Sequence, residues 1–214
     1  RTPIRGDCMN GTPNIPSPVN EPVLSYAPGS PERATLKAAL ELMSADQADI
    51  PAVVGGREIR SGRTVNVVAP HRHAEVLATV HQADAATISA AAASAVEAQR
   101  DWATWRFEDR AAVFLKAAEL LASSHRAILN AATMLGQSKT AYQAEIDSAC
   151  ELIDFLRFNV HFAEQIYREQ PASAPGIWNR MDHRPLEGFV YAITPFNFTA
   201  MGVNLPTAPA LMGN

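Results

Sequence analysis

The chain has 214 residues, of which 47% are hydrophobic and 19% charged, and its formal net charge is -4. This composition is typical of a folded globular protein, and an acidic balance without a run of Lys or Arg argues against a nucleic-acid partner. No apolar run reaches the roughly 18 residues that a membrane span needs. Two distant cysteines, Cys8 and Cys150, form no disulfide framework, so we expect a cytoplasmic protein without a membrane partner.

The first 29 residues contain six prolines and few apolar side chains. Such a stretch cannot bury enough surface to offset its ordering entropy, so residues 1–29 are predicted to be an arm, either disordered or laid over another surface. The chain starts at Arg1 and reaches its first methionine at Met9. We therefore expect the N-terminal part of a longer protein, and whether residues 1–8 are native stays open.

Residues 30–176 are predicted to form a mainly helical region with a small sheet near its start. Ser30-Pro31 suits a helix N-cap and first position, and the apolar spacing that follows predicts a helix ending near residues 44–46. Gly55-Gly56 predicts a hairpin turn, and two more strand candidates follow it. We expect a small antiparallel sheet at about residues 52–80.

A series of helices is predicted next. Asp84 is a good N-cap, and Gly136 and Pro171 are good stop signals. The helices are expected at about residues 84–105, 107–123, 126–135 and 138–170. The last would be roughly 45 Å long at 1.5 Å per residue, and its apolar side chains recur at steps of four and three, which predicts a packed seam.

The end of the chain reads as strand, loop and helix. Trp178–Arg184 alternates polar and apolar residues, and Phe189–Ile193 is apolar on both faces, which is typical of a buried parallel strand. A crossover helix is expected at residues 199–212, bent or divided by Pro206 and Pro209. No G-x-G-x-x-G glycine pattern follows the second strand, so a dinucleotide bound here must be held in another way.

The loop Thr194-Pro195-Phe196-Asn197-Phe198 is similar to the aromatic-Asn-Phe loop of the aldehyde dehydrogenase superfamily. The longer run from Phe189 to Asn214 resembles one branch of it, the 1-pyrroline-5-carboxylate (L-glutamate γ-semialdehyde) dehydrogenases. Four further stretches match that branch in the same order, namely residues 134–139, 143–147, 151–155 and 157–159.

This resemblance covers about residues 20–214 and implies the fold. The implied fold is the N-terminal part of an aldehyde dehydrogenase fold, of the α/β class and incomplete. It would contain a helical region and the small antiparallel strands of the NAD-binding domain. Residues 177–187 correspond to an oligomerisation-flap strand, which implies a homo-oligomer. Residues 188–214 correspond to the first strand of a Rossmann-like sheet and the active-site loop.

The resemblance also implies a reaction. In the family a cysteine thiolate attacks the aldehyde carbon, a hydride passes to NAD, and a glutamate activates water to release the acid. For this branch the substrate is L-glutamate γ-semialdehyde, oxidised to L-glutamate in proline degradation. The implied residues are Asn197 as oxyanion donor, Ile193, Thr194, Pro195 and Phe196 at the cofactor, and Phe196 and Glu145 at the substrate.

Some roles and alternatives stay open at this stage. Neither Cys8 nor Cys150 suits the nucleophile, because one lies in the arm and the other in a helix beside an acid, so the 214-residue chain alone is expected to be inactive. His71 and His73 lack a third ligand, so no metal site is predicted. Another aldehyde dehydrogenase branch and a non-catalytic helical scaffold remain alternative functions. The alternative structural roles are a helix cap for Asn197, a core aromatic for Phe196 and a solvated carboxylate for Glu145.

Overall fold

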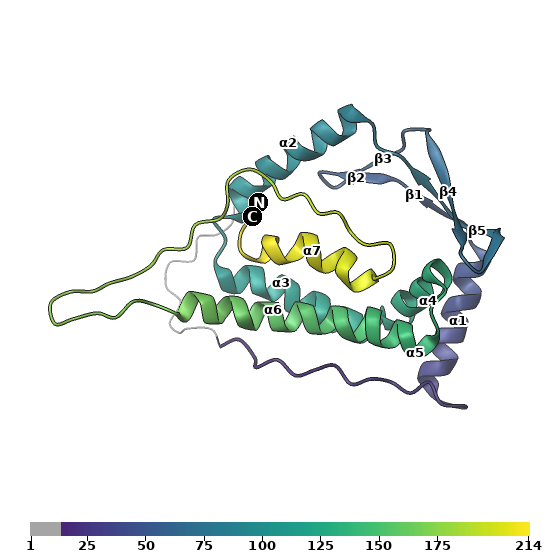
Figure 1. The fold of residues 1–214 in the computed structure, drawn as a ribbon, viewed down its shortest axis with the longest axis horizontal. Coiled ribbons are helices and arrows are strands. Elements are labelled where there is room, and N and C mark those ends of the chain that lie inside the picture. The colour runs from purple at the N-terminus through teal and green to yellow at the C-terminus, as the bar shows by residue number, and fades with distance from the viewer. Residues whose placement is uncertain (1–13) are drawn as a thin grey trace.

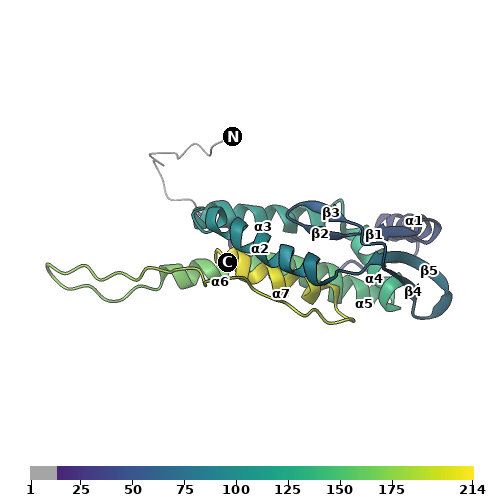
Figure 2. The same ribbon diagram turned by 90° about the horizontal axis from the view of Figure 1, so that it is seen from above.

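The computed structural model describes residues 14–214, and it is a flat helical body with a small β-region at one end (Figures 1 and 2). The helices are α1 (Pro31–Ala45), α2 (Ala85–Trp102), α3 (Phe107–Ala122), α4 (Arg126–Gln137), α5 (Ala141–Ala144), the π-helix η1 (Glu145–Cys150), α6 (Glu151–Arg168) and α7 (Thr199–Leu211). The strands are β1 (Ala48–Ile50), β2 (Ala52–Val54), β3 (Arg57–Ile59), β4 (Thr64–Ala69) and β5 (Arg72–His81). None of the helices in residues 14–214 has the length and apolarity to span a membrane. Cys8, and the stretch 1–8 whose native origin stays open, lie outside the described residues.

Local capping explains where the first two helices begin. The Ser30 hydroxyl accepts from the Arg33 N–H at 3.3 Å, and the Asp84 carboxylate accepts from the Thr87 N–H at 2.7 Å. Both predicted starts are confirmed. The predicted stop of α4 at Gly136 is wrong, because the helix continues to Gln137 and Ser138 takes the left-handed conformation with a φ of 56°.

The β-region confirms the hairpin and corrects the sheet. Strands β2 and β3 pair antiparallel across Gly55-Gly56, as predicted. The second sheet has the order β1-β5-β4, and β1 pairs with β5 in parallel, with Ala48 opposite Ala78. The expectation of a purely antiparallel sheet is therefore wrong, because this contact joins segments that are distant in sequence and leaves no local pattern.

Gly55 is expected to be essential to the hairpin. Its φ is 56°, and a Cβ added there would lie 2.9 Å from Ser94 Oγ on α2, whereas a Cβ at Gly56 (φ 74°) meets nothing within 4 Å. Each Gly→Ala change adds a left-handed penalty of about 1–2 kcal/mol. We predict that Gly55→Ala lowers the free energy of unfolding more than Gly56→Ala, measured by urea denaturation. An equal decrease in the free energy of unfolding for both variants would show that the Ser94 side chain moves away from the added Cβ without an energetic cost.

The main core lies between α3, α6 and α7, which run side by side in both ribbon views. Its buried side chains are Ala111, Phe114, Ala118, Ala149, Leu152, Ile153, Leu156, Val160, Ala163, Ala200 and Leu211. The predicted apolar seam of the long helix is confirmed from Ala149 to Ala163, while Tyr142 at its start is 63% exposed. The helix begins at the Thr140 N-cap with a capping box and contains the π-turn η1, which the sequence pattern did not predict.

Neither of the two late strands is present. Residues 178–184 belong to a loop that projects from the end of α6 (Figure 1), and the one pairing there is an isolated bridge between Ala174 and Ile177. Residues 189–193 are exposed apart from the half-buried Ala192, and they form no strand, because no strand among residues 14–214 lies beside them to share a hydrogen-bond ladder. Helix α7 contains Pro206 and Pro209 without dividing into short pieces.

Candidate functional site

The predicted active-site loop leads directly into α7. Residues 193–196 are exposed, with Ile193 77% and Phe196 92% exposed, and Asn197 is half-buried. The N-cap of α7 is Phe198, which makes no side-chain cap, and within residues 14–214 no hydrogen bond engages the Asn197 side chain. Asn197 therefore does not act as a helix cap, and its amide N–H is free to donate to a ligand.

A large cavity lies beside this loop, and Phe198 lines it. Its volume is about 780 Å³, and its wall comes from the arm, η1, α6 and the loop. The lining residues are Asn20, Glu21, Val23, Ile146, Asp147, Cys150, Glu151, Asp154, Phe155, Phe158, Asn159, Phe162 and Phe198. Phe196, the predicted pocket wall, is not among them. Five of the lining residues recur at steps of four and three, which places them on one face of the helix, outside the core seam. They are Asp147, Glu151, Phe155, Phe158 and Phe162, and this spacing is the sequence signal for the cavity wall.

The cavity has an acidic side. Burial raises the pKa of the Glu151 carboxyl, the charge of Asp147 raises it further, and Lys139 opposes both effects. Lys139 Nζ donates to Asp147 Oδ2 at 3.1 Å. A carboxyl group with a raised pKa in an apolar cavity is a common feature of functional sites.

Glu145 lies elsewhere. It is fully buried, and its carboxylate accepts hydrogen bonds from the Leu24 N–H at 2.8 Å, the Tyr26 hydroxyl at 2.7 Å and Asn130 Nδ2 at 2.8 Å, with an ion pair to Arg126. It therefore holds the arm to the helices instead of facing a substrate entrance, and it is not a solvated carboxylate either. On the same helical stretch, Asp147 and Glu151 reach the cavity.

The same network determines the ionisation of its neighbours. Burial disfavours the charged Glu145, but hydrogen bonds from Arg126, Leu24 and Tyr26 outweigh it and lower the Glu145 pKa. Burial, then the nearby Glu145 charge, raises the pKa of the Cys150 thiol to about 12. Cys150 is therefore protonated at neutral pH and unsuited to act as a nucleophile, as predicted.

The described part of the arm is laid over the helices. Of the two alternatives predicted for residues 1–29, disordered or laid over another surface, the second therefore holds for residues 14–29. Glu21 accepts from Arg126 and, at 2.7 Å, from Arg157, and Asp154 accepts from the Glu21 N–H at 2.7 Å. Figure 1 shows this segment running along α6.

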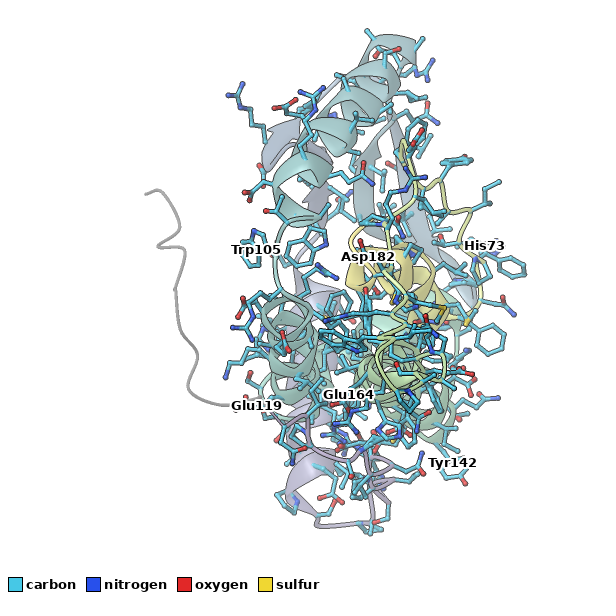
Figure 3. All side chains as sticks on the ribbon, turned by 90° about the vertical axis from the view of Figure 1, so that its left-hand side faces the viewer. His73, Trp105, Glu119, Tyr142, Glu164 and Asp182 are labelled. Carbon is cyan, nitrogen blue, oxygen red and sulfur yellow. The ribbon has the colours of Figure 1, made fainter. Side chains whose placement is uncertain are left out.

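A separate cavity of about 350 Å³ is lined by Glu164 and Asp182, which are labelled in Figure 3, and no residue of the loop 193–198 takes part in it.

The loop 193–198 and the helices around it lie within a region that matches a known protein family. The sequence pattern of the aldehyde dehydrogenase family matches residues 58–214. The chain belongs to the aldehyde dehydrogenase family. Its fold is thus part of an aldehyde dehydrogenase fold, which confirms the predicted α/β class and the predicted incompleteness relative to that fold.

The predicted resemblance to one branch of the aldehyde dehydrogenases is also confirmed. The chain is 52% identical over 202 residues to Delta-1-pyrroline-5-carboxylate dehydrogenase from Agaricus bisporus, covering 94% of this chain and 37% of that protein. It is 47% identical to the mitochondrial enzyme of Homo sapiens, covering 91% of this chain and 35% of the other. The solved structure of the Mycobacterium tuberculosis enzyme bound with NAD superposes with a TM-score of 0.94 at 57% identity, covering 96% of this chain and 39% of that one. The chain therefore spans little more than a third of the length of these relatives.

Proposed function

We propose that this chain is part of an NAD-dependent dehydrogenase that oxidises L-glutamate γ-semialdehyde, the open form of 1-pyrroline-5-carboxylate, to L-glutamate in proline degradation. The observation that carries the proposal is the unengaged Asn197 amide beside the cavity that Phe198 lines. The similarity to the NAD-bound Mycobacterium tuberculosis structure over 96% of the chain supports it.

The segment from Ile193 to Phe196 suits a cofactor ledge. It is exposed, its backbone forms no strand ladder within residues 14–214, and its two large apolar side chains, Ile193 and Phe196, lie on the surface. A dinucleotide offers both polar edges and flat rings to such a surface. Ile193, Thr194, Pro195 and Phe196 would hold NAD, which accepts a hydride when bound.

Asn197 would stabilise the negative oxygen that develops when a nucleophile attacks the aldehyde carbon. A donor that is already in place at that position acts without reorganisation during the reaction. Because the amide has no partner of its own within the described residues, no existing hydrogen bond must break first.

The cavity has the chemistry of the semialdehyde. Its aromatic walls suit the methylene chain, and its carboxylates suit the α-ammonium group. We assign the substrate-facing carboxylate to Glu151, with Asp147 beside it, in place of Glu145. The buried position of Glu145 gives it no access to a ligand in this structure.

A chimera tests the reaction: this chain replaces the matching segment of the Mycobacterium tuberculosis relative. We expect the chimera to form NADH from NAD and L-glutamate γ-semialdehyde, and to oxidise propionaldehyde much more slowly, because propionaldehyde lacks the α-ammonium group. The readout is NADH absorbance. Efficient oxidation of propionaldehyde with none of the semialdehyde would contradict the substrate and favour another aldehyde dehydrogenase branch.

The 214-residue chain by itself is the matched control, and we expect no NADH from it. Cys150, the cysteine among residues 14–214, is protonated and buried. Turnover by this chain alone would contradict the account of the nucleophile.

The projecting loop supports assembly into a homo-oligomer. Trp178 is 81% and Leu186 68% exposed on this loop, within the flap predicted at residues 177–187. Apolar side chains on a projection are suited to a subunit contact.

The cytoplasmic location stays a prediction, and several relatives, including the human one, are named as mitochondrial.

A further inference from the structure

Phe198, the residue after Asn197, is held in place by a cation. Lys139 Nζ lies 4.3 Å from the centre of the Phe198 ring while it donates to Asp147 Oδ2 at 3.1 Å. The Lys139 side chain is 14% exposed, and the attraction of a cation to an aromatic face is stronger when water is displaced. The ring is therefore tied both to the segment after α4 and to η1.

Thr199, the first residue of α7, is held by α4. Gln137 Nε2 donates to Thr199 Oγ1 at 2.9 Å, and Thr133 Oγ1 lies 2.9 Å from the same oxygen. Thr133 Oγ1 lies 2.8 Å from Ser148 Oγ, so a chain of side-chain hydrogen bonds joins α4, η1 and α7. Since α7 lacks a side-chain N-cap, these bonds orient its first turn.

The two holding residues, Gln137 and Lys139, flank one strained residue. Ser138 has a φ of 56°, and its Oγ lies 2.8 Å from His71 Nδ1 in the turn between β4 and β5. A non-glycine residue in this region persists when its surroundings determine it. The segment 137–139 is therefore anchored at its middle, with one side chain directed at each of the two residues that follow Asn197.

We propose that Gln137 and Lys139 are positioning residues for Asn197, an inference that rests on the proposed dehydrogenase function. Neither side chain reaches the Asn197 amide itself. They fix Phe198 and Thr199, and through these residues the backbone that directs the amide. An oxyanion donor acts only from the correct position, and a misplacement of about 1 Å can reduce a rate about 100-fold.

A double-mutant cycle in the chimera tests this inference. Lys139→Met and Gln137→Met put an unbranched apolar side chain of similar size in each position and remove its polar contact to the loop. We expect each to lower kcat by about tenfold or more and to leave the KM for NAD nearly unchanged, while Lys139→Arg, which keeps the cation, restores most of the rate. In an Asn197→Ala background, the same Met variants should cause almost no further loss, since they act through Asn197.

The control is Lys116→Met, because Lys116 pairs with Glu119 on the exposed face of α3 and should change neither kcat nor stability. Equal losses with Asn197 present and in the Asn197→Ala background would overturn the inference and show a general structural role. Unchanged kcat in both Met variants would also overturn it. A chimera that folds by circular dichroism but does not oxidise the semialdehyde would instead refute the proposed function, on which the inference depends.

Discussion

Asn197→Ala in the chimera is expected to lower kcat for the semialdehyde by about 100- to 1,000-fold, the loss typical of removing one oxyanion donor. The reason is geometric: the Asn197 amide is unengaged within the described residues and lies in the loop between the exposed segment 193–196 and the cavity beside Phe198. The variant should fold normally, because no hydrogen bond of the described structure is lost with this side chain. Steady-state kinetics and the melting temperature are the two measurements.

Asn66→Ala supplies the comparison for this prediction. Asn66 is an exposed residue of β4 and faces Thr79 of the neighbouring strand, so its replacement should leave kcat unchanged. If Asn197→Ala lowered the melting temperature and kept kcat, Asn197 would be a structural residue and the oxyanion assignment would be wrong. A rise in KM alone would indicate substrate binding without a transition-state role.

Glu145→Gln is expected to reduce the free energy of unfolding of the 214-residue chain by about 3–5 kcal/mol, the cost of breaking a buried ion pair. The carboxylate is fully buried and joins Arg126 to the arm through Leu24 and Tyr26. Loss of its charge leaves the Arg126 guanidinium without its main buried partner. Denaturant unfolding provides the measurement, with Glu119→Gln of the exposed Lys116 pair as a control that should cost about 0–1 kcal/mol.

The effect of Glu145 should also depend on pH. Its pKa in the folded chain is lowered from the ordinary 4.5, so its stabilisation is complete above pH 4.5 and is lost as the pH falls through the lower folded value. The stability gap between the unsubstituted chain and Glu145→Gln should therefore be largest near neutral pH and shrink in acid. A gap that stays constant down to strongly acidic pH would contradict an ionised Glu145.

Tyr26→Phe gives a second measurement in case Glu145→Gln does not fold. It removes the hydrogen bond to the carboxylate, which for a charged acceptor is worth about 1.5–3 kcal/mol, and it also removes the hydroxyl that accepts from Asn130 Nδ2. Burial, and then the hydrogen bond to Glu145, raises the pKa of Tyr26 to about 12. Loss of the arm contact should appear as faster proteolysis within residues 14–29, and an unchanged cleavage rate would show that the network does not hold the arm.

Part of the candidate site could be predicted from the sequence, because one short stretch contains it. The loop Thr194–Phe198 was located by its residues, and the structure leaves Asn197 with the free amide that its proposed role requires. The cavity could not be predicted in the same way. Its walls come from the arm, η1, α6 and the loop, and whether Glu145 or Glu151 faces it depends on the helix rotation, to which the unpredicted π-turn between them contributes.

The sequence by itself determined the elements whose causes are local. Ser30 and Asp84 begin helices because their side chains accept from the first backbone N–H groups, and Gly55-Gly56 turns a hairpin because glycine tolerates positive φ. The core face of the long helix follows from its apolar period in the same way. Each of these depends on groups a few residues apart, so the pattern is visible in one stretch of chain.

Tertiary structure alone decided what depends on a partner distant in sequence. Strand β1 exists because β5 pairs with it in parallel, and residues 189–193 form no strand because none among residues 14–214 pairs with them, although their apolar pattern predicts one. Glu145 is ionised in the interior because Arg126 and the arm surround it. Backbone ladders and buried charges are stable only when their partners are present, and composition and period do not encode where those partners lie.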